Sequence, residues 1–204
     1  MQRNISQNPQ VMESIVSEQQ RAKQKRQNPA VIWLTGISGA GKSTLAFAVD
    51  RYLTDNEFHS FVLDGDDLRL GLSSDLGFSE AARHENIRRV GEVSKLFCQS
   101  GLLTLVSLIS PFRADRQTVR NLVGSNFVEI YIKAPLEVCE QRDTKGFYKK
   151  VRDGKLSDFT GIDSIYEEPL NPELMVETDK ESVEASTQRI IDYLKSRGLL
   201  RHQD

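Results

Sequence analysis

The stretch that decides the fold is VIWLTGISGAGKS, residues 31–43. Its second part, residues 36–43, matches the pattern GxxxxGK[ST] in full. Glycines allow such a loop to turn its backbone N–H groups toward phosphate oxygens, and the helix that follows adds the positive end of its dipole. The apolar run before the loop predicts a buried strand, and the residues after it predict a helix. This context favours a nucleotide phosphate site over a purely structural glycine turn.

Each residue type in this loop has an expected task. The ammonium of Lys42 reaches the β- and γ-phosphates, and the hydroxyl of Ser43 coordinates Mg²⁺. The sequence has no NKxD-type guanine reader, which favours ATP over GTP. The loop residues predicted to bind ATP are Gly36, Ile37, Ser38, Gly39, Ala40, Gly41, Lys42, Ser43 and Thr44.

Outward from this loop, strand-like apolar runs alternate with helical patterns, as in a parallel sheet whose strands are connected by helices. The expected strands are residues 31–35, 58–64, 102–108, 127–133 and 174–178. The chain therefore predicts an α/β P-loop NTPase fold. Its sheet is doubly wound, mainly parallel and five-stranded, with helices on both faces.

Two segments fall outside this alternation. Residues 1–28 form a polar leader, expected to be disordered or helical, before a kinase domain at 29–204. Residues 143–172 are too long for an ordinary connection, and within 145–155 they carry five cations and one anion. A solvated charged loop would explain this composition, but the upstream phosphate loop favours a lid that closes over phosphates.

The bulk composition narrows the class of protein. The net charge of −2 and a pI near 6.0 give no general attraction to nucleic acid or to anionic membranes. No apolar run is long enough to cross a bilayer, and the N-terminal residues lack the apolar core of a signal peptide. We therefore expect a cytoplasmic protein without nucleic-acid or membrane partners.

Acidic and basic residues cluster where the second and third strands should end. Asp64 ends the second strand and Asp66 and Asp67 follow it, at the edge where parallel strands present their carboxyl ends to a ligand. A carboxylate there can hold water around Mg²⁺ or accept a proton from an attacking hydroxyl, although a capped turn would also use these residues. Arg69, Arg83 and Arg113 suit an anionic group on the acceptor.

Together these motifs resemble the adenylylsulfate kinase family, which phosphorylates the 3′-hydroxyl of adenosine 5′-phosphosulfate. The resemblance spans about residues 29–194 and includes the long string PLEVCEQRDTKGFYKKVRDGKLSDFTGIDSIYEEP, which other P-loop kinases do not share. The shorter matching motifs are GISGAGKST, LDGDDLRLGL, RHENIRRVGEV and SLISPFRADR. It implies MgATP as donor, a homodimer, ATP sulfurylase as a functional partner, and a place in sulfate assimilation.

The resemblance also implies individual roles. Lys42, Asp66 and Ser110 are the implied catalytic residues, and Ser43 and Asp66 the implied metal ligands. Arg142 and Thr178 match the region that holds the adenine of ATP. Phe78 and Phe159 match an aromatic pair around the acceptor's adenine, and the polar loop around Phe159 argues against a core position. The implied substrate-binding set is Asp66, Arg69, Phe78, Arg83, Asn86, Ile109, Ser110, Lys145 and Phe159.

The chain departs from the family pattern at Asp67, where the family usually has asparagine. The extra carboxylate adds negative charge beside the predicted metal site. Ser110 matches a serine that is phosphorylated in some members, which we interpret as a side reaction. Two alternatives stay open: another small-molecule P-loop kinase, and a nucleotide-binding subunit without turnover.

Overall fold

The computed structural model describes residues 15–155 and 159–201, so the first half of the predicted leader lies outside the described part. Its strands form one five-stranded sheet in the order β2-β3-β1-β4-β5, and every neighbouring pair is parallel. The strands are β1 (Ala30–Thr35), β2 (Ser60–Asp64), β3 (Leu103–Ser107), β4 (Phe127–Lys133) and β5 (Leu174–Glu177). All the predicted strands are confirmed, with small shifts at their ends.

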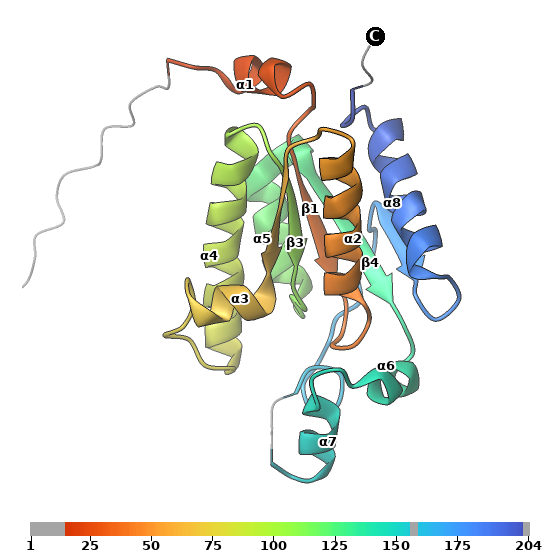
Figure 1. The fold of residues 1–204 in the computed structure, drawn as a ribbon. Coiled ribbons are helices and arrows are strands. Elements are labelled where there is room, and N and C mark those ends of the chain that lie inside the picture. The colour runs from red at the N-terminus through yellow and green to blue at the C-terminus, as the bar shows by residue number, and fades with distance from the viewer. Residues whose placement is uncertain (1–14, 156–158, 202–204) are drawn as a thin grey trace, which may run out of the picture.

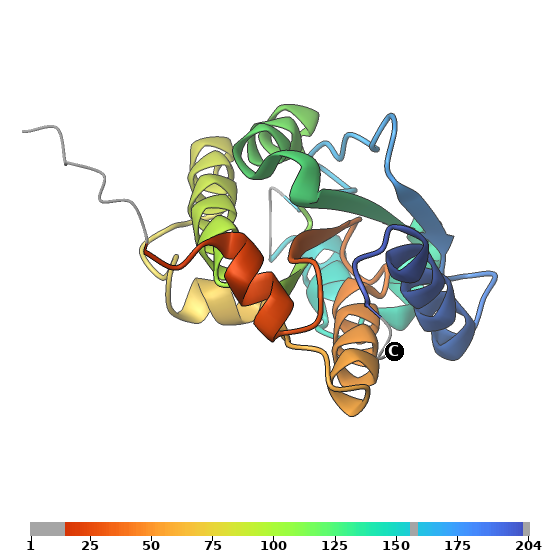
Figure 2. The ribbon, with the colours of Figure 1, turned by 90° about the horizontal axis from the view of Figure 1, so that it is seen from above.

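The helices are α1 (Glu18–Gln24), α2 (Lys42–Asp55), α3 (Gly65–Leu70), α4 (Glu80–Gln99), α5 (Arg113–Val123), α6 (Leu136–Arg142), α7 (Phe147–Arg152) and α8 (Val183–Ser196), with a short 3₁₀ turn at Gly124–Asn126. Helices α2 and α8 cover one face of the sheet, and α4 and α5 cover the other (Figures 1 and 2). No helix in the described part of the chain has the length and apolar character needed to cross a membrane.

Strand β1 shows why both faces are covered. Ile32 and Leu34 point into the larger core beneath α2 and α8, whereas Val31 and Trp33 point into the smaller core beneath α4 and α5. A strand with apolar side chains on both faces must be buried on both faces, which explains its continuous apolar sequence. The predicted doubly wound arrangement is confirmed.

The described part of the predicted leader contains helix α1, which lies across the amino ends of the strands (Figures 1 and 2). Gln27 follows this helix and is fully buried. Its side-chain amide donates to the carbonyls of His59 and Gly101, at 2.8 Å each, and accepts from the N–H of His59 at 2.8 Å. These bonds attach the N-terminal segment to the residues just before β2 and β3.

Helices α6 and α7 lie at the opposite end of the molecule, beyond the carboxyl end of β4 (Figure 1). The loop after β1, helix α3 after β2 and the loop after β3 also begin at this end of the sheet. The predicted phosphate loop, the acidic cluster and the predicted lid therefore meet at one edge, where a ligand site is expected.

Candidate active site

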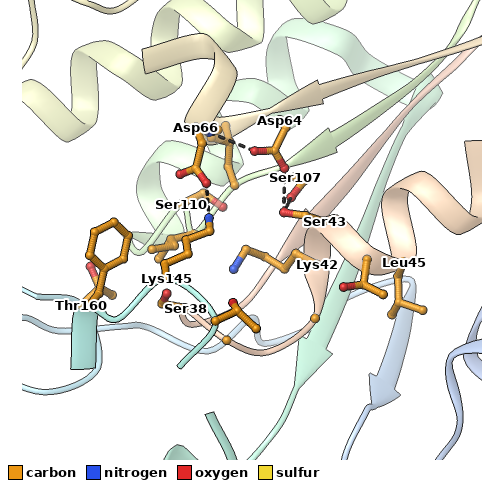
Figure 3. Close-up of a pocket in the computed structure, with 18 of the residues that line it drawn as sticks. Ser38, Lys42, Ser43, Leu45, Asp64, Asp66, Ser107, Ser110, Lys145 and Thr160 are labelled. Atoms are coloured by element: carbon orange, nitrogen blue, oxygen red, sulfur yellow. Dashed lines mark hydrogen bonds and ion pairs between the residues drawn. The ribbon is translucent and has the colours of Figure 1, made fainter. Parts of the chain in front are cut away.

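A pocket of about 450 Å³ lies at this edge, and Figure 3 shows its interior. Most of the predicted site residues line it, although they come from segments far apart in the sequence. Those that line it are Ser38, Gly39, Gly41, Lys42, Ser43, Thr44, Asp66, Arg69, Phe78, Arg83, Asn86, Ile109, Ser110, Arg142, Lys145, Phe159 and Thr178. Gly36, Ile37 and Ala40 belong to the same loop but do not line this pocket.

Two glycines determine the path of the phosphate loop. A Cβ atom at Gly36 would lie 2.2 Å from the carbonyl oxygen of Ile132, so only glycine allows the loop to pass this close to β4. Gly41, the N-cap of α2, has a φ of +96°, which side chains rarely tolerate. The loop therefore leads directly into the N-terminus of α2, where unpaired N–H groups favour an anion.

Lys42 is buried at the floor of the pocket, and its Nζ donates to the carbonyl of Ile37 at 2.8 Å. Burial, followed by repulsion from Lys145, lowers the pKa of Lys42 to about 8. A buried ammonium that is hydrogen-bonded to an uncharged carbonyl is stabilised by any anion that enters the site. The lysine is thus placed to gain a phosphate as its partner.

The hydroxyl of Ser43 lies next to an acid that the residue roles above did not include. Ser43 Oγ donates to Asp64 Oδ2 at 2.6 Å and lies 3.1 Å from Ser107 Oγ (Figure 3). Asp64 is buried at the end of β2, and its other oxygen accepts from the N–H of Asp66 at 3.0 Å. Asp66 is the predicted metal ligand from the acidic cluster, yet Asp64 is the acid in contact with Ser43. Its position as the last residue of the strand was the available signal.

Asp66 faces the lid across the pocket. Its carboxylate pairs with the ammonium of Lys145, which lies just before α7 (Figure 3). The Asp66 side chain is 59% exposed, so this pair is open to solvent and to a ligand. The arrangement places a carboxylate and a lysine of the predicted lid together in the same pocket as Lys42.

Two guanidinium groups lie at the end of the pocket that is predicted to bind the acceptor. Arg69 stacks 4.5 Å from the centre of the Phe78 ring and donates to the carbonyl of Gly77 at 2.8 Å. Arg83 donates to the carbonyl of Phe78 at 2.8 Å and to Thr160 Oγ1 at 2.7 Å. Burial and the nearby Arg83 lower the pKa of Arg69. Two cations this close favour an anion between or beside them.

Asn86 adds an unsatisfied polar atom to this end. It is 4% exposed, and its Oδ1 has no hydrogen-bond partner among the described residues. A buried oxygen without a donor is unfavourable unless a ligand or water supplies one. Arg113, in contrast, does not line the pocket; its Nε donates to the carbonyl of Glu168 at 2.7 Å.

Phe159 is more buried than its polar loop suggests. It is 9% exposed and packs edge-on against Tyr148, with ring centroids 4.9 Å apart. The argument against a core position is therefore wrong, because the ring belongs to the larger core and also lines the pocket. Phe78, the other member of the predicted aromatic pair, is 58% exposed.

Ser110 lines the pocket, but its hydroxyl is engaged inside the protein. Ser110 is 2% exposed; its Oγ accepts from Trp33 Nε1 at 3.0 Å and donates to Thr35 Oγ1 at 2.9 Å. In this arrangement the hydroxyl holds the loop after β3 against strand β1.

Arg142 and Thr178 meet at the end of the pocket that is predicted to bind the donor. Arg142 donates to the carbonyl and the hydroxyl of Thr178 at 2.7 and 3.0 Å, and Thr178 Oγ1 donates to the carbonyl of Ala40 at 2.8 Å. The sequence reasoning missed Glu181 and Ser186, which also line this end. Glu181 Oε2 and Ser186 Oγ are buried without a partner among the described residues. Nothing in the local sequence marks these two, since only packing brings them to the pocket.

A glycine-rich loop between β1 and α2, with a buried lysine and a serine–aspartate contact, defines a P-loop phosphotransferase. A model of the adenylylsulphate kinase family matches residues 28–177. The chain therefore belongs to the adenylylsulphate kinase family, and adenylyl-sulfate kinase activity is its function.

Individual relatives agree with this assignment. The chain is 54% identical over 186 residues to the adenylyl-sulfate kinase of Aeromonas hydrophila, covering 91% of this chain and 94% of that protein. It is 53% identical over 183 residues to the probable adenylyl-sulfate kinase of Halalkalibacterium halodurans, covering 89% and 91%. A solved structure of the Mycobacterium tuberculosis APS kinase in complex with AMPPNP and APS matches with a TM-score of 0.79 and 44% identity, covering 83% of this chain and 99% of that one.

Proposed function

We propose that the pocket binds MgATP at its phosphate-loop end and adenosine 5′-phosphosulfate at the end lined by Arg69 and Arg83. The γ-phosphoryl group passes from ATP to the 3′-hydroxyl of the acceptor, which gives 3′-phosphoadenylylsulfate and ADP. The observation that carries this proposal is that one continuous pocket joins Lys42 to the arginine pair. The solved relative that holds AMPPNP and APS together supports a ternary arrangement of this kind.

On the donor side, the loop N–H groups and Lys42 stabilise charge on the transferring phosphoryl group. Lys42 can shift from the carbonyl of Ile37 to a phosphate oxygen. The carbonyl is an uncharged partner, whereas the buried charge of the lysine favours an anion. Arg142, tied to the loop through Thr178, lies where the base of the donor would extend.

Mg²⁺ fits the oxygen atoms at the end of β2. Mg²⁺ prefers oxygen ligands and is usually held by phosphates, waters and one or two carboxylates rather than by a complete protein cage. Ser43 and Asp64 offer a hydroxyl and a carboxylate in contact, with Asp66 beside them. In the described part of the chain no group of three His, Cys, Asp or Glu residues could hold a metal alone. When bound, the ion would neutralise charge on the phosphates.

On the acceptor side, Asp66 orients the ribose 3′-hydroxyl and accepts its proton. Arg69 and Arg83 hold the phosphosulfate, with Asn86 nearby. Phe78 and Phe159 contact the adenine, where stacking on a base adds area and π contact. Ile109 and Ser110 form the pocket wall, so we assign Ser110 a structural part in acceptor binding.

Closure of the lid, within residues 143–172, would exclude water that would otherwise hydrolyse ATP. The pair between Asp66 and Lys145 supports this role, because the lid already contacts the acceptor side through it. On ligand binding Lys145 exchanges part of this contact for the acceptor or the phosphates.

The test compares two acceptors. Purified protein is incubated with MgATP and either adenylylsulfate or AMP, and both ADP and 3′-phosphorylated product are followed. AMP keeps the adenosine and the 5′-phosphate but lacks the sulfate. Turnover with adenylylsulfate and little with AMP is expected. Equal turnover with both would favour another small-molecule kinase, and ATP binding without turnover of either would favour a non-catalytic subunit.

The assembly and location of the enzyme follow from the family resemblance. We propose a homodimer in the cytoplasm that uses adenylylsulfate supplied by ATP sulfurylase. Light scattering on the purified chain tests the dimer, because a monomer and a dimer of a 23.1 kDa chain differ twofold in mass.

A further inference from the structure

A buried chain of hydrogen bonds lies behind the wall of the acceptor site. Trp33 Nε1 donates to Ser110 Oγ at 3.0 Å, Ser110 Oγ donates to Thr35 Oγ1 at 2.9 Å, and Thr35 Oγ1 donates to the carbonyl of Ile109 at 2.7 Å. An indole N–H can only donate and a carbonyl can only accept, so the two ends fix the direction of every proton between them. The chain therefore has one arrangement, and each buried hydroxyl has a partner.

Tyr166 joins this chain from another segment. Its hydroxyl lies 3.0 Å from Thr35 Oγ1. Because the hydroxyl proton of Thr35 goes to the carbonyl of Ile109, the hydroxyl of Tyr166 must donate to Thr35 Oγ1. Burial raises the pKa of Tyr166 to about 12, so the phenol keeps its proton at neutral pH. Thr35 is thus the centre of the network, with one bond donated and two accepted.

Arg116 makes a second connection between the same segments. It is buried, and it donates to the carbonyl of Ser110 at 2.6 Å, to the carbonyl of Glu167 at 2.7 Å and to Glu129 Oε1 at 2.7 Å. The N–H of Glu167 also donates to the carbonyl of Pro111 at 2.9 Å. Residues 109–111 are therefore bound at several points to residues 166–167.

The backbone of Ser110 explains why this loop needs support. Its φ of +42° lies in the left-handed region, which residues with a side chain adopt at a cost in free energy. The surrounding contacts must hold such a conformation. Here the carbonyl and the hydroxyl of Ser110 are both held, by Arg116 and by the Trp33–Thr35 chain.

Residues 166–167 follow, after one turn of the chain, two residues that line the acceptor end of the pocket. Phe159 lines the pocket, and Thr160 Oγ1 accepts from Arg83 at 2.7 Å. Between them and Tyr166 the chain makes a tight turn in which the N–H of Gly161 donates to the carbonyl of Ser164 at 2.8 Å. A displacement at Tyr166 would therefore be transmitted to Phe159 and Thr160 over a short, hydrogen-bonded path.

We infer that Thr35 and Tyr166 are positioning residues for the acceptor: their hydrogen bond fixes the Ile109–Ser110 wall against the 159–167 segment that carries Phe159. Neither hydroxyl needs to touch the substrate. This inference rests on the proposed function, because it assumes that adenylylsulfate occupies the end of the pocket between these two walls.

The test uses Tyr166→Phe, which removes one hydroxyl, and Thr35→Val, which removes the centre of the network at nearly constant volume. We expect KM for adenylylsulfate to rise about fivefold in Tyr166→Phe and about tenfold or more in Thr35→Val, with KM for ATP within about twofold of wild type. Tyr193→Phe is the matched control; its hydroxyl accepts from Arg197 at 2.8 Å on α8.

The double variant provides the sharper measurement. If both hydroxyls act through one network, Thr35→Val with Tyr166→Phe should have the same KM for adenylylsulfate as Thr35→Val alone. Effects that multiply, or equal rises in KM for both substrates, would overturn the inference. An unchanged KM in Tyr166→Phe, the milder change, would overturn it even if Thr35→Val does not fold.

Calorimetric binding of adenylylsulfate separates this inference from the proposed function. A wild-type protein that binds adenylylsulfate without turnover would contradict the proposed function, while the loss of binding in the variants would still support the network. A wild type that turns over, with variants that bind and react as it does, would contradict the network alone.

Discussion

Burial controls the chemistry of single residues in this pocket, and Lys42 shows it most clearly. The free protein holds this lysine with a pKa of about 8, chiefly because of burial. A bound triphosphate places negative charge beside it and must raise that pKa. Above pH 8, ATP can therefore bind well only if Lys42 takes up a proton.

We predict proton uptake on ATP binding that grows with pH. At pH 8.5 a group with a pKa of about 8 is roughly one-quarter protonated, so binding should take up about three-quarters of a proton, and affinity should fall as the pH rises further. Isothermal titration in two buffers with different ionisation enthalpies measures this number. Heats that do not depend on the buffer at pH 8.5 would contradict the assignment of Lys42 as the phosphate contact.

Glu181 supports a prediction about the choice of donor base. Its buried Oε2 and the buried hydroxyl of Ser186 lack partners among the described residues and line the donor end. A carboxylate can only accept, so it suits the amino group of adenine and repels the carbonyl at the same position in ITP. We expect Glu181→Gln to reduce the preference for ATP over ITP about tenfold, because an amide can donate to that carbonyl.

The matched control is Glu184→Gln, an exposed acid on the first turn of α8. It removes the same charge three residues further along the chain and should leave the ratio of kcat/KM for ATP and ITP unchanged. Equal ratios in wild type and Glu181→Gln would exclude Glu181 from base recognition.

How far the sequence predicts this site depends on whether a residue's role is local. The phosphate loop could be predicted because its glycines answer a local backbone requirement, as at Gly36 and Gly41. The burial of Phe159 and the place of Glu181 in the pocket could not be predicted, because both depend on packing between residues far apart in the sequence. Asp64 lies between these cases, since the acidic cluster was recognised but only packing shows which acid contacts Ser43.

At the scale of elements, the strands were predictable because each is an apolar run covered on both faces. The contacts between the helices were less predictable from the sequence. His84 on α4 lies 2.7 Å from the carboxylate of Asp115 on α5, a pair to which no sequence pattern assigned a role. The hydrogen bond to Asp115 is the main cause that raises the pKa of His84.

This pair predicts a pH-dependent part of the stability. A histidine whose pKa is raised on folding stabilises the protein fully below its unfolded pKa, about 6.5, and that contribution is lost as the pH rises through the higher folded value. The ring is 41% exposed, so solvent screening limits the effect to below about 1 kcal/mol.

Urea unfolding of wild type and His84→Gln at pH 6 and pH 9 measures this contribution. The difference in the free energy of unfolding should be larger at pH 6. His59→Gln, which replaces a histidine just before β2, is the control variant and is unfolded at the same two pH values. A difference that is constant across this range, or larger at pH 9, would show that the His84–Asp115 contact does not depend on the histidine charge.

Over the whole molecule, residues 27–28 and 199–200 meet at the amino end of the sheet. The pocket lies at the carboxyl end, where the loop after β1 and helix α3 begin; Figure 1 shows these two ends of the sheet. The N–H of Asn28 donates to the carbonyl of Leu199 at 2.9 Å, and Gln27 forms a β-bridge with Leu200. Residues 15–28 belong to the polar leader predicted at residues 1–28. The buried amide of Gln27 instead joins them to the sheet, a long-range contact that the polar composition of the segment does not reveal.

This separation predicts that stability and catalysis respond to different substitutions. Gln27→Ala would leave the N–H and carbonyl of His59 and the carbonyl of Gly101 without their buried partner, so we expect a loss of about 2–4 kcal/mol in the free energy of unfolding. KM for both substrates should stay unchanged, because these contacts lie at the opposite end from the pocket. Gln24→Ala, an exposed position on α1, should cost less than about 0.5 kcal/mol.

Urea unfolding and steady-state kinetics on the same preparations test both the stability and the KM values. A loss in Gln27→Ala no larger than in Gln24→Ala would show that the N-terminal segment adds little to the fold. A change in KM would show instead that the two ends of the sheet are coupled.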